Sequence, residues 1–337
     1  MATQNAFNGG TVAKVGAGFA IALVLLYLFG TVVGWAAIAR TLRAADPRWF
    51  GLALASTTLG LAAWAKAWDE VLCVIDVDIP FPSLVVTYFA GTFADYVTPM
   101  GKAGGGPLIA YLLSTDDRIS YHESLATLTT ADLLNLVPYF LFAVVGGLGL
   151  AFRGGLPRRA DLLAGALGGV AVVVGSGGYL AWRYRTTVTY SLVALLTPVL
   201  ERTPFVDVAT VREEIHGFYE EMDRIADEPR LLGYTLALGV TGWVLFTIPL
   251  YLAGLTVGVT LDPLVVMFVV TASTVAGLVP TPGGLGGVEV ALVGLLVALT
   301  PLSAGSAAAI ALLYRVASYW YVLGVGGLAA FYEVYSY

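Results

Sequence analysis

Hydrophobic positions along the chain are grouped in long blocks, and polar residues are concentrated in the connections between them. Six blocks are long enough to cross about 30 Å of hydrocarbon as helices. They cover residues 15–39, 50–75, 119–151, 160–182, 230–258 and 303–331. Two more apolar regions, 81–117 and 262–300, are each split near the middle into parts too short for a comfortable crossing. The pattern predicts an all-α polytopic membrane protein with about six full spans and two re-entrant helical hairpins.

The two split regions are interrupted in the same way. The first contains 97-VTPMGKAGGGPLIAYLL-113 and the second contains 279-VPTPGGLGGVEVALVGLL-296. An offset of 183 positions aligns their prolines, glycines and paired leucines. The same offset sets Asp132 opposite Arg315, each near the centre of a span. We predict two repeats, residues 1–159 with hairpin 81–117 and residues 160–337 with hairpin 262–300.

The predicted repeats are inverted relative to each other, because each contains three crossings and a hairpin. Arginines follow the first span at positions 40, 43 and 48 and the third span at 153, 158 and 159. The positive-inside rule places both short loops in the cytoplasm, which fits a hairpin that enters and leaves on one side. Inverted repeats with broken helices at the midplane are typical of transporters. The second repeat also contains a predicted amphipathic helix at about 208–228.

Composition supports a multi-pass protein of the cell (plasma) membrane. Hydrophobic residues make up 58% of the chain, and the mean hydropathy is +0.83. The net charge of −6 argues against a nucleic-acid partner. Cys73 is the single cysteine, and without a Cys/His cluster we expect no metal site. Catalytic and nucleotide-binding motifs are missing, so we expect neither a cofactor nor an enzyme.

The interruptions are the first candidate site. Irregular backbone in the membrane is tolerated only where protein or a wet cavity covers it. The second helix of each hairpin starts at the glycines, so its N–H groups and positive dipole end point toward the midplane. Lys102 adds a positive charge to the first tip, and together these groups favour an anion such as phosphate. The tip residues are Gly104, Gly105, Gly106, Pro282, Gly283, Gly284 and Gly286.

Charged residues inside apolar segments are the second candidate site, because such residues usually face a partner or a cavity. Arg315, which follows Tyr314 in 311-ALLYRVASYWY-321, is the clearest case. Asp132 is its symmetric counterpart and a candidate partner. Glu289 follows the second glycine tip, where it either complements the helix dipole or binds a cation or proton. Asp95 precedes the first tip, and the same alternatives apply to it.

These motifs resemble a known family. The segment 279–296, followed by 312-LLYRVASYW-320, is similar to the flippase-like membrane family that includes the transmembrane part of lysylphosphatidylglycerol synthases. The resemblance implies a homodimer that moves a lipid or its charged headgroup between leaflets. It also implies roles for the second glycine tip, Glu289 and Arg315. Many relatives have a basic residue near the position of Asp132, so this chain departs from the family there.

The predicted function is that of a lipid flippase-like transporter, with membrane lipids as partners. A polar or anionic (phospho)lipid headgroup would pass a midplane site while its tails stay in the lipid. The alternatives are a small-anion transporter or channel, which would need no lateral opening, and a non-transporting membrane subunit of an envelope lipid or glycan pathway. Midplane charges favour lipid transport and anion transport over the non-transporting subunit. Between these two, the family resemblance alone favours lipid transport.

Overall fold

The structure is a computed structural model of the chain. It describes residues 46–74, 77, 79–98, 106, 109–110, 113–114, 119, 121–153, 228–278 and 281–336, and isolated positions within 27–43 and 169–184. Every regular element of the described part is a helix. The predicted spans 15–39 and 160–182 lie outside the described residues apart from those isolated positions, and the predicted amphipathic helix at 208–228 lies outside them except for Glu228.

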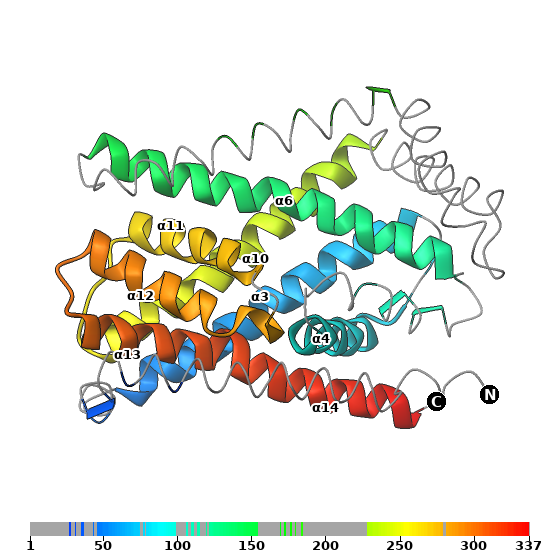
Figure 1. The fold of residues 1–337 in the computed structure, drawn as a ribbon. Helices are drawn as coiled ribbons and strands as arrows, with labels where there is room; N and C mark the ends of the chain where they lie inside the picture. The colour runs from blue at the N-terminus through cyan, green and yellow to red at the C-terminus, as the bar shows by residue number, and fades with distance from the viewer. Residues whose placement is uncertain are drawn as a thin grey trace, which may run out of the picture.

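Eight α-helices of the described part form the framework that holds the candidate site (Figure 1). They are α3 (Pro47–Val74), α4 (Phe81–Val97), α6 (Tyr121–Phe152), α10 (Pro229–Thr256), α11 (Pro263–Thr274), α12 (Gly287–Leu299), α13 (Ala304–Arg315) and α14 (Tyr321–Ser336). Short 3-10 turns, η2 (Val275–Leu278) and η3 (Pro282–Gly284), lie between α11 and α12. A π-helical segment, η4 (Val316–Trp320), joins α13 to α14. In Figure 1, α6 follows one side of the molecule and α13 with α14 the opposite side.

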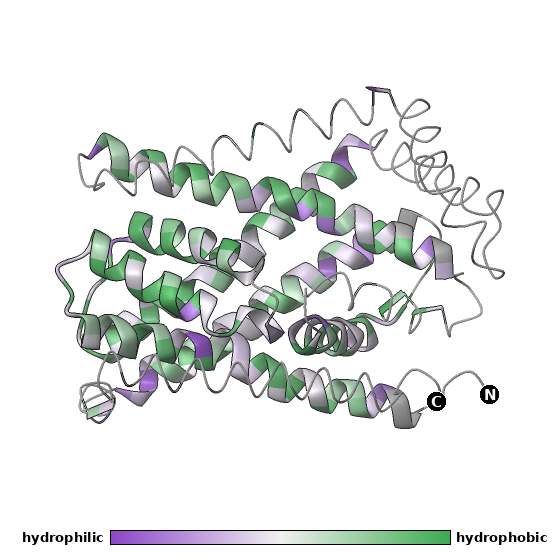
Figure 2. Cartoon of the chain, in the orientation of Figure 1, coloured by the Kyte–Doolittle hydropathy of each residue, from purple (hydrophilic) through white to green (hydrophobic). Residues whose placement is uncertain are grey.

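The predicted spans of the described part are helices with nearly the predicted bounds. Hydrophobic residues dominate these helices along most of their length (Figure 2). Within the described residues, four helical stretches are long and apolar enough to cross a membrane, namely Glu123–Phe152, Pro229–Thr256, Pro282–Leu299 and Ala304–Glu333. Helix α3 is not one of the four, and it carries a charged cluster of Lys66, Asp69 and Glu70. The all-helical membrane fold is therefore confirmed, while the number of full spans stays a prediction.

Region 262–300 is a pair of packed helices, α11 and α12, joined by a glycine turn. Asp262 starts α11, because its Oδ1 accepts a hydrogen bond from the Leu264 N–H at 2.8 Å. Its Oδ2 accepts from Arg153 at 2.7 Å and so ties this end to α6. The re-entrant geometry stays a prediction, since Pro282–Leu299 is itself long enough to cross. In the first hairpin, the structure describes α4 and only single residues of the arm that follows.

Contacts between the two predicted repeats are reciprocal. Helix α10 packs along α3, α14 packs along α4, and α11 packs along α6. The repeat alignment makes α3 equivalent to α10, α4 to α11, and α6 to α13–α14. Exchanging the repeats turns the α4–α14 contact into the α11–α6 contact and leaves the α3–α10 contact unchanged. A two-fold relation between the repeats would require this. This pairing supports the inverted repeat, which stays a prediction.

Close glycine contacts hold these reciprocal pairs together. A Cβ at Gly146 of α6 would lie 2.8 Å from the backbone nitrogen of Phe268 in α11. A Cβ at Gly326 of α14 would lie 2.5 Å from the carbonyl oxygen of Phe89 in α4. Small residues let membrane helices approach closely, because dispersion contacts between backbones replace contacts with lipid.

We expect Gly146→Ala to destabilise the protein by about 1–3 kcal/mol, because the added methyl group forces α6 away from α11. Thermal unfolding in detergent measures the effect. Gly233→Ala in α10 is the control, since a Cβ there meets nothing within 4 Å, and alanine favours helix over glycine. Equal midpoints for Gly146→Ala and the wild type would contradict the close packing of α6 on α11.

Candidate functional site

The turn between α11 and α12 needs glycine for conformational reasons. Gly283, Gly284 and Gly286 have φ values of 55°, 65° and 86°, in the left-handed region that other residues rarely adopt. The Thr281 hydroxyl donates to the Leu285 carbonyl oxygen at 2.9 Å and closes the turn. A Cβ at Gly284 would also lie 2.6 Å from the Cα of Gly277. The second predicted glycine tip is thus a tight, closely packed turn.

Glu289 caps the helix that leaves this turn. Its Oε2 accepts a hydrogen bond from the Gly286 N–H at 2.7 Å, and the side chain is buried, with the residue 2% exposed. A carboxylate in the first turn compensates the unpaired N–H groups and positive dipole end of a helix. Glu289 therefore has the dipole-complementing role, and it occupies the place where an anion was predicted to bind.

Arg315, at the end of α13, completes the arrangement. Its Nε donates to Glu289 Oε1 at 2.6 Å, and its Nη2 donates to the Gly283 carbonyl oxygen at 3.0 Å. The guanidinium carbon lies 4.3 Å from the centroid of the Tyr319 ring, a cation–π contact. Arg315 is 7% exposed. We call this group the Glu289–Arg315 pair.

These contacts correct the predicted partner of Arg315 and show how its charge is compensated. The repeat alignment set Asp132 opposite Arg315, but the carboxylate that bonds Arg315 comes from Glu289 in the same half of the chain. Equivalent positions in a repeat need not touch, whereas Glu289 is brought to Arg315 by the packing of α12 on α13. The positive charge is also already compensated, so Arg315 and the second tip do not form an open anion site in this structure.

Tyr96 of α4 connects the Glu289–Arg315 pair to a second polar region. Its ring centroid lies 4.9 Å from that of Tyr319, and its hydroxyl donates to the Ser318 carbonyl oxygen at 3.4 Å. Ser318 and Tyr319 belong to the π-helical segment η4. Such segments inside α-helices are frequent at functional sites, because the extra residue redirects side chains and frees carbonyl groups.

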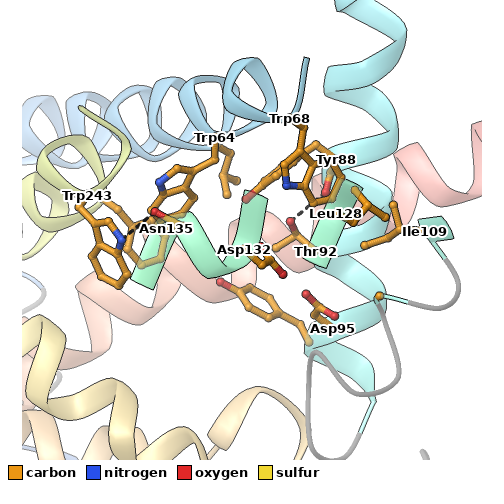
Figure 3. A pocket seen from close by; sticks show the side chains of 14 residues that line it. Trp64, Trp68, Tyr88, Thr92, Asp95, Ile109, Leu128, Asp132, Asn135 and Trp243 are labelled. Carbon is orange, nitrogen blue, oxygen red and sulfur yellow. Dashed lines mark hydrogen bonds between the residues drawn. The ribbon is translucent and has the colours of Figure 1, made fainter. Parts of the chain in front are cut away.

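The second polar region is a cavity of about 210 Å³ between α3, α4, α6 and α10 (Figure 3). Among the described residues that line it, the charged side chains are those of Asp95 and Asp132. Figure 3 shows the two carboxylates facing the same space, with Asn135 and Trp243 farther along the wall. A smaller hollow continues past Asp132 and Asn135 toward Thr235.

Helical periodicity explains how each wall presents its side chains. Residues three or four positions apart lie on one face of a helix. The lining residues follow this spacing on all four helices: Leu61, Trp64 and Trp68 on α3; Tyr88, Thr92, Asp95 and Tyr96 on α4; Leu128, Asp132 and Asn135 on α6; and Trp243 and Phe246 on α10. The cavity is therefore rich in aromatic side chains, with polar groups supplied mainly by α4 and α6.

The predicted site residues fall into two groups. Pro282, Gly283, Gly284, Gly286, Glu289 and Arg315 form the turn and the Glu289–Arg315 pair, with Tyr314 buried in the core beside them. Asp95, Asp132 and Gly106 line the cavity, and a Cβ at Gly106 would meet nothing within 4 Å. Lys102, Gly104 and Gly105 lie outside the described residues. The prediction missed the aromatic walls and Asn135, although its place three residues after Asp132 is a usable signal.

The described helices and these two centres define a polytopic helical membrane protein with ionic and polar groups buried between its helices. The chain belongs to the family described as the lysylphosphatidylglycerol synthase TM region, which matches residues 15–326. The predicted family resemblance is therefore confirmed over nearly the whole chain.

Archaeal relatives match over similar lengths. A UPF0104 membrane protein of Methanothermobacter thermautotrophicus is 28% identical over 327 residues, covering 93% of this chain and 92% of the relative. A UPF0104 membrane protein of Pyrococcus horikoshii is 26% identical over 323 residues, covering 91% and 93%. Both relatives are membrane proteins by name, which agrees with the apolar helices described above.

Proposed function

We propose that the protein is a lipid flippase-like transporter of the plasma membrane that moves a polar lipid headgroup between leaflets. The observation that carries this proposal is the cavity in which Asp95, Asp132 and Asn135 are held among apolar helices. Ionisable residues inside membrane helices are costly, and they are usually retained where a substrate passes. The volume of about 210 Å³ suits a headgroup, whereas the acyl or isoprenoid tails would stay in the surrounding lipid.

The described lining of the cavity supports a polar headgroup over a small anion. It offers hydrogen-bonding groups, namely the carboxylates of Asp95 and Asp132 and the amide of Asn135. Arg315, the cation predicted to attract an anion, is compensated by Glu289. The small-anion alternative is therefore less well supported by the described residues than passage of a headgroup.

Reconstitution into liposomes tests the proposal. Fluorescent phosphatidylglycerol, phosphatidylcholine and a monoglycosyl diacylglycerol are included one at a time, and bleaching from outside reports how much label reaches the outer leaflet. An anion-flux assay runs on the same vesicles. Translocation of at least one lipid is expected. Anion flux without lipid movement, or neither activity, would refute the flippase-like function.

We expect Asp132→Asn to slow lipid translocation about ten-fold or more, because a charge-assisted hydrogen bond to the passing headgroup is lost. Glu333→Gln is the matched control. Glu333 is a buried carboxylate on α14 that accepts from the Thr87 hydroxyl at 2.8 Å, and it does not line the cavity. Equal rates for the two variants would show that Asp132 contributes no more than an unrelated buried carboxylate.

A further inference from the structure

We propose that the cavity binds a single sugar-like ring, so that the headgroup is a glycosyl or similar polyol group. This inference rests on the proposed function for its physiological meaning, while the binding itself can be tested without transport. Three observations lead to it: the aromatic walls, the hydrogen-bonding groups between them, and the size of the space.

The aromatic walls offer flat surfaces at several angles. Trp68 and Tyr88 have ring centroids 4.4 Å apart, and Trp64 lies 5.5 Å from Trp243 in an edge-on arrangement. The face of an aromatic ring is electron-rich, so it attracts groups that carry partial positive charge. A sugar ring has such a face, because its axial C–H bonds are polarised by the neighbouring oxygens. Among the described residues, six aromatic side chains line this space, namely those of Trp64, Trp68, Tyr88, Tyr96, Trp243 and Phe246.

The polar groups match the edge of a polyol. The carboxylates of Asp95 and Asp132 accept hydrogen bonds, and a bond from a hydroxyl to a carboxylate is charge-assisted. Either carboxylate can accept from a hydroxyl while also bonding to a protein group, because each has about four lone-pair sites. The sugar assignment therefore does not depend on the state of any other partner of these two residues.

Asn135 adds hydrogen-bond donors to the acceptors of the two carboxylates. Its Oδ1 accepts a hydrogen bond from the Trp243 indole N–H at 3.1 Å. This bond fixes the orientation of the amide, and the NH₂ donors of Asn135 take no part in it. A hydroxyl can accept from this NH₂ group and donate to Asp132, which lies three residues earlier on the same face of α6. An ammonium group, which has donors only, could bond the carboxylates but would leave the NH₂ donors of Asn135 without an acceptor.

Size and hydrogen bonding argue against a whole lipid or a purely apolar group. Pockets for drug-sized ligands usually occupy about 300–1,000 Å³, so a cavity of about 210 Å³ holds one small ring and not a whole lipid. A purely apolar group would leave the Asn135 NH₂ donors without water or an acceptor, at considerable energetic cost.

Binding of soluble probes to the detergent-purified full chain tests the inference. The detergent must have a polyoxyethylene headgroup, because maltoside or glucoside detergents would compete. The probes are methyl α-D-glucopyranoside, choline chloride and inorganic phosphate. Binding of each probe is measured by calorimetry and by tryptophan fluorescence. Trp64, Trp68 and Trp243 line the cavity, so bound sugar should change the tryptophan emission. We expect saturable binding of the glucoside, with choline and phosphate at least about ten-fold weaker.

Variants localise the binding. Asp95→Asn and Asn135→Leu should each weaken glucoside binding about ten-fold, whereas Glu333→Gln and Trp320→Phe, which lie outside the lining, should not. Unfolding midpoints within a few degrees of the wild type confirm that the cavity variants are folded. If Asp95→Asn or Asn135→Leu does not fold, Asp132→Asn replaces it in the binding measurement. Tighter binding of choline or phosphate, absence of glucoside binding, or binding unaffected by every cavity variant would overturn the inference.

The inference and the proposed function can fail separately. Glucoside binding without lipid translocation would contradict the transporter and leave the sugar site standing. Translocation of phospholipid without glucoside binding, and without preference for the monoglycosyl lipid, would contradict the sugar site and leave the transporter standing.

Discussion

Arg315→Ala is expected to lower stability by about 3–5 kcal/mol, which is the usual cost of removing one partner from a buried ion pair. The substitution leaves the Glu289 carboxylate buried without its cation. It also removes the hydrogen bond to the Gly283 carbonyl and the contact with the Tyr319 ring. Since these contacts hold the turn between α11 and α12, loss of lipid translocation should accompany the loss of stability.

Thermal unfolding in detergent and translocation in liposomes measure the two effects. Arg315→Lys should fall between alanine and the wild type, because an ammonium keeps the charge but cannot reproduce the planar set of contacts. The double variant Glu289→Gln with Arg315→Met should be more stable than Arg315→Ala, since neither side chain then carries an uncompensated charge.

Arg153→Ala is the matched control, because it breaks an ion pair of similar length at the surface. Arg153 bonds Asp262 at 2.7 Å, with its side chain 63% exposed. Exposed pairs contribute about 0–1 kcal/mol. If Arg315→Ala and Arg153→Ala cost the same, burial of the Glu289–Arg315 pair does not matter for stability, and its assigned role in the turn would be wrong.

Gly283→Ala should have the second largest effect. The residue has φ of 55°, and a side chain held in a sparsely populated backbone region costs about 1–3 kcal/mol. The new Cβ would also overlap the ring of Tyr319, which is fully buried and cannot move aside. Because Tyr319 packs between Arg315 and Tyr96, the displacement should reach both the Glu289–Arg315 pair and the cavity.

The expected result is a lowered unfolding midpoint together with strongly reduced translocation. Gly294→Ala in α12 is the control, since a Cβ at that helical position meets nothing within 4 Å, and alanine should be neutral or stabilising there. A Gly283→Ala protein with wild-type midpoint and rate would mean that the turn relaxes without cost.

Local sequence predicted the helices and the second turn well. Apolar blocks gave bounds within a few residues for α3, α6, α10 and α13–α14. The run of glycines predicted an interruption between two helices, and the structure has a turn there in which Gly283, Gly284 and Gly286 adopt positive φ. These features depend on neighbours along the chain, so a single sequence carries the necessary information.

Partners across the fold were harder to predict. The repeat alignment makes Asp132 equivalent to Arg315 and hence a candidate partner, but equivalence does not mean contact. The N-terminal end of α12 was expected to attract an external anion, yet Glu289 already compensates it from the first turn. The anion prediction depended on the positive groups near the turn. The sequence does not show which carboxylate packs against those groups in the folded protein.

By itself, the sequence determined that this is a helical membrane protein with two glycine interruptions and a few costly intramembrane charges, because hydrophobic blocks, glycine and charge act through local free energies. Only the tertiary structure decided how those charges are used. Packing of α12 on α13 joins Glu289 to Arg315, while α3, α4, α6 and α10 enclose Asp95, Asp132 and Asn135 in an aromatic cavity. The physical reason is that an ion pair or a cavity depends on distances between segments far apart in the chain, and those distances follow from the packing of whole helices.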